Sequence, residues 1–222
     1  MNEEERKQDT VEPEDKAENA AYRKKIAVRF LIVLGVAAAV LFIANLILDR
    51  AGKTQSSSDD EATESVQLFE PDYDYDIFTD EFYTELERWM NYTYGGMTTR
   101  VFTEEDAEKT DRYAEFFFSY FDALVHGEYE GFDSFFTEEY LKKHGSFGRF
   151  TMQQIYNISV DYLTSESDDE TGEIYHVFRV AFAIRRNNGT VFRYSESNKT
   201  IPYLYQIIES ADGGIGINLI KR

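Results

Sequence analysis

One segment of the 222-residue chain, Ile26 to Leu48, constrains what the rest can be. It reads IAVRFLIVLGVAAAVLFIANLIL, and no polar side chain interrupts it from Phe30 to Ala44. About 20 apolar residues are needed to cross the hydrocarbon core of a bilayer. Arg29 is close enough to the segment's start to extend its charge to the interface. The segment is therefore predicted to be a transmembrane helix in contact with the lipid bilayer.

A cleavable signal peptide is the alternative for this segment. Signal peptides have an apolar core of about 7–15 residues, followed by a cleavage site of small residues. The apolar core here is longer, and Ala44-Asn45-Leu46 continues directly into ILDR without such a site. The pattern favours an uncleaved, single-pass anchor.

The orientation follows from the positive charges on either side of the segment. Four lie at its N-terminal side and two close to its C-terminal side: Arg23, Lys24, Lys25 and Arg29, against Arg50 and Lys53. Positive charge is retained in the cytoplasm. Residues 1–25 are therefore predicted to be a disordered cytoplasmic tail and residues 49–70 a flexible acidic linker. The C-terminal domain is expected outside the cell membrane.

Charge and cysteine content exclude several classes of function. The net charge is −19, and residues 49–222 contribute −18 of it. Such a domain repels phosphate backbones, so we expect no nucleic-acid partner. Cysteine is absent, which excludes disulfides and thiolate sites and is typical of a bacterial surface protein rather than a secreted eukaryotic one.

Residues 71–103 are predicted to be a helical approach segment. Thr79 can cap a helix that ends at Gly95-Gly96. Its apolar face would carry Phe82, Leu86, Trp89 and Met90 at helical spacing. This face either packs on its own domain or docks a partner, and in the second case Trp89 and Phe82 are the candidate partner-binding residues.

Residues 104–222 are predicted to form an α+β domain. A long helix is predicted to begin at a Thr103 cap and to end at His126-Gly127, with the aromatic residues from Tyr113 to Leu124 on one face. Further helix follows to Gly145. From Ile155 the period changes to two, and the Asn187 to Gly189 turn predicts a hairpin. We expect the helices to pack on one face of a twisted antiparallel sheet of about four to five strands.

The aromatic helix in FFFSYFDALVHGEYEGFDSFFTEEYLKKHG, followed by a strand meander, resembles the nuclear-transport-factor-2-like (cystatin-like, SnoaL-like) superfamily. The resemblance covers roughly residues 104–222 and implies a cone between helices and sheet. The layout of tail, single span, tether and outer domain is similar to that of the bitopic core subunit of type IV secretion and conjugation systems. Shared layout is an analogy for function.

Enzymes of this superfamily place His, Asp or Tyr at the base of the cone. His176 shares strand parity with Phe178, so these two residues, with Tyr120 and Phe117, are the candidate pocket. His126 and His144 are better explained as bases in the last turn of helices, and Asp161 lies on the opposite strand face. No catalytic constellation, metal-ligand spacing or phosphate loop is present, so we predict no catalytic residues, no metal and no cofactor.

The sequence thus predicts a non-enzymatic, membrane-anchored binding or scaffold module. Its expected partners are other membrane or envelope proteins, or a second copy of the chain. An anchor favours this reading because it raises the effective concentration of an assembly subunit. The alternative is a small-molecule-binding or catalytic domain of the same fold.

Overall fold

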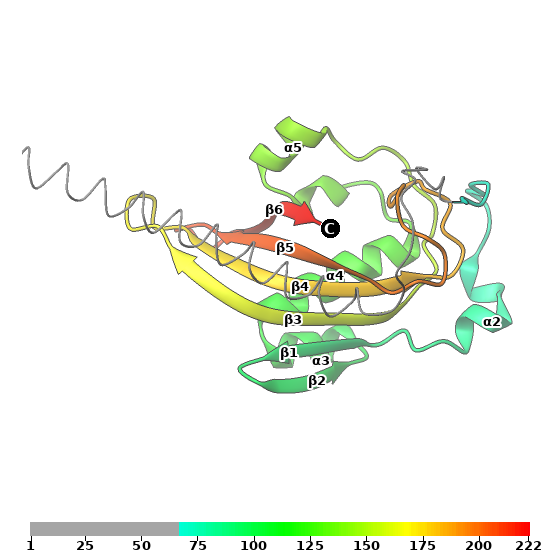
Figure 1. Cartoon of the computed structure of the whole chain (residues 1–222), viewed down its shortest axis with the longest axis horizontal. Coiled ribbons are helices and arrows are strands. Elements are labelled where there is room, and N and C mark those ends of the chain that lie inside the picture. The colour runs from blue at the N-terminus through cyan, green and yellow to red at the C-terminus, as the bar shows by residue number, and fades with distance from the viewer. Residues whose placement is uncertain (1–66) are drawn as a thin grey trace, which may run out of the picture. The chain divides into compact units, whose positions relative to one another are not determined.

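The computed structural model describes residues 67–222, which belong to one compact unit (Figure 1). The predicted tail, membrane anchor and nearly all of the linker lie outside these residues. No helix between residues 67 and 222 is long and apolar enough to span a bilayer. The α+β class is confirmed, with a six-stranded sheet in the order β2-β1-β3-β4-β5-β6.

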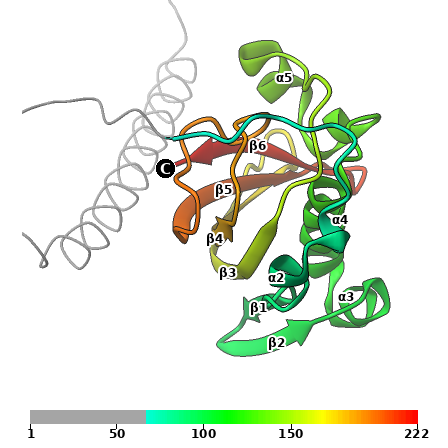
Figure 2. The same cartoon turned by 90° about the vertical axis from the view of Figure 1, so that its right-hand side faces the viewer.

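The sheet is formed by β1 (Met90–Tyr94), β2 (Met97–Val101), β3 (Ile155–Ser167), β4 (Ile174–Ile184), β5 (Ile201–Glu209) and β6 (Ile215–Lys221). The helices are η1 (Ile77–Thr79), α2 (Glu81–Thr84), α3 (Glu104–Thr110), α4 (Arg112–His126), η2 (Phe132–Phe135) and α5 (Glu138–His144). In Figure 2 the strands curve around α4, which runs along one face of the sheet.

Helix α4 forms the centre of the core. Asp111 caps its first turn by accepting from the amides of Tyr113 and Ala114. The predicted aromatic face is buried, and Phe117 packs edge-on against Phe178 of β4 at 5.0 Å between ring centroids. The helix ends at Gly127, which adopts the left-handed conformation with φ 69°. The end of this helix at His126-Gly127 was thus correctly predicted, but its start was not: the sequence placed it at Thr103, whereas Asp111, with extended backbone, separates α3 from α4.

The N-terminal segment of residues 67–80, here called the strap, runs across the domain before the first strand. Phe69 donates its amide to the carbonyl of Asn187 at 2.8 Å. At its other end Asp80 caps α2 and pairs with Arg185, and the side-chain amide of Gln154 donates to it at 3.1 Å. Burial raises the pKa of Asp80, but the hydrogen bonds from Gln154 and Arg185 outweigh it and hold the pKa below its ordinary value.

The helix predicted to run from a Thr79 cap to Gly95-Gly96 is wrong beyond Thr84, and Asp80 rather than Thr79 caps α2. Residues 90–101 form the β1–β2 hairpin, in which Gly95 and Gly96 have φ of 57° and 81° and make the turn rather than a helix stop. Met90 and Tyr92 alternate into the core, and β1 pairs in parallel with β3 from Met90 opposite Ile158. Burial and pairing on both edges of β1 override the helical spacing. The segment therefore belongs to the same sheet as residues 104–222.

Two other details of the sheet differ from the prediction. The sheet has six strands and is mixed, because β1 and β3 are parallel. Residues 187–200 form a loop rather than a hairpin strand. The buried side-chain amide of Asn187 holds this loop by donating to the carbonyls of Phe192 and Ser195 at 2.7 and 2.6 Å. These hydrogen bonds satisfy backbone carbonyls of the loop with a side chain of the loop itself, and the segment does not join the sheet.

Gly127→Ala is expected to lower the free energy of unfolding by about 1–3 kcal/mol, the usual cost of a left-handed residue other than glycine. An added Cβ would also lie 2.9 Å from the backbone nitrogen of Met152. Urea denaturation followed by Trp89 fluorescence measures the loss. Gly148→Ala is the matched control, because a Cβ there meets nothing within 4 Å. Equal losses of unfolding free energy in the two variants would contradict the assignment of Gly127 as the left-handed end of α4.

Candidate functional site

Three of the predicted pocket residues, Phe117, Phe178 and Tyr120, lie in the core, and His176 lies at its edge. Phe117 and Phe178 are fully buried, and Tyr120 packs against Tyr205 with their hydroxyls 3.2 Å apart. None of these rings lines the groove described below. The space between α4 and the sheet is therefore occupied by aromatic side chains at this point.

His176 belongs to a polar cluster at the edge of this core. Its Nε2 lies 2.7 Å from the hydroxyl of Tyr113, which donates to Glu209 at 2.5 Å. Arg112 in turn pairs with Glu209 at 2.7 Å. The single hydroxyl proton of Tyr113 points to Glu209, so Nε2 is the protonated nitrogen of the neutral imidazole. Its buried Nδ1 has no hydrogen-bond partner among the described residues.

The electrostatics of the cluster favour a neutral histidine beside an ionised glutamate. Burial lowers the pKa of His176, and the attraction of Glu209 only partly offsets it. The hydrogen bond from Tyr113 holds the pKa of Glu209 below its usual value, with Arg112 adding to the effect. The sequence pointed to His176 but not to Tyr113 or Glu209 as its partners, because they come from α4 and β5, far apart in the chain.

The stability of the domain is expected to fall as the pH drops below 6.5. The folded-state pKa of His176 lies below the value of 6.5 for an unperturbed histidine, so the unfolded chain takes up a proton first. Full stability is therefore present above pH 6.5 and is lost on acidification through that value. Urea denaturation at pH 5.0 to 7.5 checks the direction. His176→Gln, which does not titrate, is expected to flatten the curve.

The contribution of Glu209 has a different pH window. Its folded pKa lies below the ordinary 4.5, so its stabilising effect is lost only at more acidic pH. His126 and His144 are present in both the wild type and His176→Gln. The difference between their curves of stability against pH therefore isolates the contribution of His176. Parallel curves for wild type and His176→Gln would contradict the assigned role.

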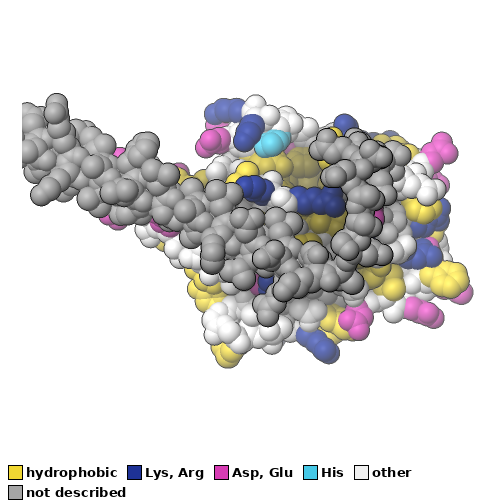
Figure 3. Space-filling model, in the orientation of Figure 1, with side chains coloured by type: hydrophobic (Ala, Val, Ile, Leu, Met, Phe, Trp, Pro, Cys, Tyr) yellow, Lys and Arg dark blue, Asp and Glu magenta, His cyan; other side chains and the backbone are white. Residues whose placement is uncertain are grey.

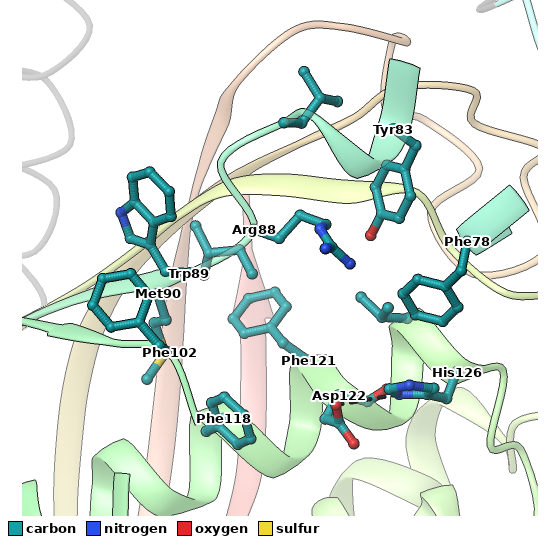
Figure 4. A pocket seen from close by; sticks show the side chains of 13 residues that line it. Phe78, Tyr83, Arg88, Trp89, Met90, Phe102, Phe118, Phe121, Asp122 and His126 are labelled. Atoms are coloured by element: carbon teal, nitrogen blue, oxygen red, sulfur yellow. Dashed lines mark hydrogen bonds and ion pairs between the residues drawn. The ribbon is translucent and has the colours of Figure 1, made fainter. Parts of the chain in front are cut away.

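A groove lies between α4 and the segment that joins α2 to β1 (Figure 4). Its volume is about 500 Å³. Three polar side chains, Arg88, Asp122 and His126, contribute to its lining. The rest of the lining is apolar or aromatic and consists of Phe78, Tyr83, Leu86, Trp89, Met90, Phe102, Phe118, Phe121, Val125 and Ile158. We call this the Trp89 groove.

Trp89 and Phe102 form one end of the Trp89 groove. The β1–β2 hairpin brings the two residues together, because Trp89 immediately precedes β1 and Phe102 immediately follows β2. Their ring centroids lie 5.6 Å apart. Phe102 is 57% exposed, and the guanidinium of Arg100 lies over the Trp89 ring at 5.5 Å. An open aromatic pair of this kind is typical of binding surfaces.

The polar side chains of the groove lie toward its other end, as Figure 4 shows. Nδ1 of His126 contacts the Asp122 carboxylate at 3.2 Å and the Asp122 carbonyl at 3.0 Å. Arg88 lies over the rings of Phe78 and Tyr83 at 5.6 and 5.5 Å. The sequence singled out Trp89 and His126, but not Arg88, Phe102 or Asp122. Their grouping depends on the hairpin, which the helical reading of this segment had missed.

The remaining predicted residues lie elsewhere. Phe82 is 73% exposed and lies under the guanidinium of Arg185, outside the Trp89 groove. His144 is in the last turn of α5 and packs on Tyr140. Asp161 pairs with Arg179 of β4 at 2.8 Å. Within residues 67–222, no group of three or more His, Asp or Glu side chains is placed to hold a metal.

The described domain is acidic overall. Residues 67–222 carry 29 acidic and 14 basic side chains, a net charge of −15. On the face shown in Figure 3, charged side chains of both signs are scattered around the margin, with apolar side chains between them. An apolar hollow with a few polar groups is the usual form of a binding site.

The fold and the groove define a small α+β domain with an aromatic-lined groove. Comparison with models of protein families, with curated proteins and with solved structures gave no match.

Proposed function

We propose that the chain is a membrane-anchored, extracytoplasmic binding or scaffold module that docks another envelope protein at the Trp89 groove. Ile26 to Leu48 would anchor it, with residues 1–25 in the cytoplasm. We further propose that the described domain is a nuclear-transport-factor-2-like module of a bacterial envelope assembly. An anchor supports this role because tethering raises the effective concentration of a subunit at its assembly.

The open aromatic end of the groove is the observation that carries the proposal. Trp89 and Phe102 are large apolar rings at the surface of a strongly acidic domain. Aromatic residues of this kind supply much of the binding energy in protein interfaces. A small-molecule-binding or catalytic domain is the second candidate, since about 500 Å³ is within the range of ligand pockets. The packed rings around Phe117 and Phe178 count against a ligand in the interior of the cone.

The proposed membrane topology can be tested with single cysteines, because the chain contains none of its own. Thr10→Cys and Phe102→Cys each create a unique thiol in the chain. In intact cells, a membrane-impermeant maleimide is expected to label position 102 and to label position 10 only after lysis. The reverse pattern, or equal labelling of both positions in intact cells, would contradict the proposed orientation.

Docking at the groove is testable by photo-crosslinking. A benzophenone maleimide attached to Phe102→Cys is expected to give a discrete adduct with an envelope protein in intact cells. Trp89→Ala in the same background is expected to reduce the adduct at least fivefold, because large interface aromatics contribute roughly 2 kcal/mol or more. Tyr194→Cys, at a position that is also exposed, is the control. Equal adducts from positions 102 and 194, or none from position 102, would refute docking at this surface.

A further inference from the structure

We propose that the Trp89 groove recognises a peptide segment in which a large apolar side chain stands beside a carboxylate, and that Arg88 binds that carboxylate. The inference rests on the proposed function, since it names the chemistry of the partner that docks there. Three features support it: the unused hydrogen-bond donors of Arg88, the charges around Arg88 and the apolar walls of the groove.

Arg88 has a charge and donors that the described domain does not satisfy. Its guanidinium lies over Phe78 and Tyr83, and its recorded contacts are with these two rings. Within residues 67–222 it forms no ion pair and donates no hydrogen bond. A guanidinium carries five N–H donors in a fixed fork that matches a carboxylate. Stacking on two rings holds the fork in place and leaves it available for a ligand.

The other charged side chains of the groove do not neutralise Arg88. Asp122 is the one carboxylate in the lining, and its recorded side-chain contact is with His126 on its own helix. Three other arginines of the domain are paired with acids: Arg112 with Glu209, Arg179 with Asp161, and Arg185 with Asp80. Others, such as Arg149 and Arg186, stack on aromatic rings and form no ion pair among the described residues. What distinguishes Arg88 is its place in the lining of an apolar groove, where its exposed guanidinium is accessible to an anionic ligand.

A second cation supports the same partner. Arg100 lies over Trp89, on the open end of the groove, and also forms no ion pair among the described residues. Arg88 lies just before β1 and Arg100 lies in β2, so the two arginines flank the aromatic wall from neighbouring segments. A peptide that buried an apolar side chain against Trp89 and Phe102 would bring flanking carboxylates within the field of both.

The size and lining of the groove fit a short peptide anchor. About 500 Å³ accommodates one or two large side chains, and most of the wall is aromatic or aliphatic. Elsewhere in the domain, the LFE sequence of the strap, Leu68 to Glu70, places the Phe69 ring 4.8 Å from the Arg186 guanidinium.

Three capped peptides test the proposal directly. They are acetyl-DLFE-amide, acetyl-NLFQ-amide and acetyl-KLFK-amide, which share the apolar pair and differ in the flanking charge; capping removes the terminal charges. The full chain is reconstituted in nanodiscs of neutral phosphatidylcholine. Trp89 is the single tryptophan of the chain and reports binding by its fluorescence. DLFE is expected to bind at least fivefold more tightly than NLFQ, and KLFK more weakly than either.

Two variants with opposite expected effects locate the charge. Arg88→Gln is expected to weaken DLFE binding about fivefold to tenfold and to leave NLFQ binding unchanged. Asp122→Asn is expected to strengthen DLFE binding about twofold, because it removes the carboxylate that repels the peptide. Lys142→Gln removes a positive charge on exposed α5, away from the groove, and should change nothing. Circular dichroism checks that each variant is folded.

The outcomes separate this inference from the proposed function. Equal affinity for the three peptides, or an Arg88→Gln variant that still prefers DLFE, would contradict the role of Arg88 while leaving a purely apolar docking groove. No response of Trp89 to any peptide would refute peptide recognition, and the cross-link from position 102 then decides protein docking by itself. A Trp89 signal that depends on protein concentration alone would identify a second copy as the occupant and contradict the inference.

Discussion

The contact between the aromatic face of α4 and the inner face of the sheet is the interaction on which the described domain depends. Phe117 and Tyr120 pack against β4 and β5, and the buried hydroxyls of Tyr120 and Tyr205 satisfy each other. Buried hydroxyls need partners, and large rings contribute most of the buried apolar area of such a core. Once this contact is made, the direction of α4 is fixed, and Gly127 brings the chain against the backbone of Met152.

The groove forms at the border of this contact, where the core receives the hairpin. β1 adds to β3 in parallel, which places Met90 over the helix and leaves Trp89 at the surface. The short helix α2 and the strap close the other side, with Tyr83 fixed by its hydroxyl bond to the carbonyl of Ile155 at 3.0 Å. The Trp89 groove is thus built from segments that the core positions but does not cover.

The sequence was most informative where the signals are local. The α4 helix could be predicted from its spacing and caps, and so could the four strands that begin at Ile155, Ile174, Ile201 and Ile215. The hairpin was missed because Phe82, Trp89 and Met90 also fit a helical period, and because the parallel pairing of β1 with β3 joins distant segments. No local pattern reports such a pairing. The groove was missed for the same reason. Trp89 could be identified from the sequence as a candidate partner-binding residue, but its grouping with Arg88 and Phe102 depends on the tertiary fold.

The strap also decides how the domain would respond to mechanical tension. A pull at Gln67 acts first on the bond from Phe69 to Asn187, and next on the ion pair of Asp80 with Arg185. Phe78 lies between these two attachment points and Tyr83 just beyond them, and both form the wall on which Arg88 stacks. The strands lie further along the chain, held by many hydrogen bonds in parallel. Tension at the N-terminal end of the described domain would therefore dismantle the wall behind Arg88 before it reached the sheet, so that this surface would persist only while that end carries no load.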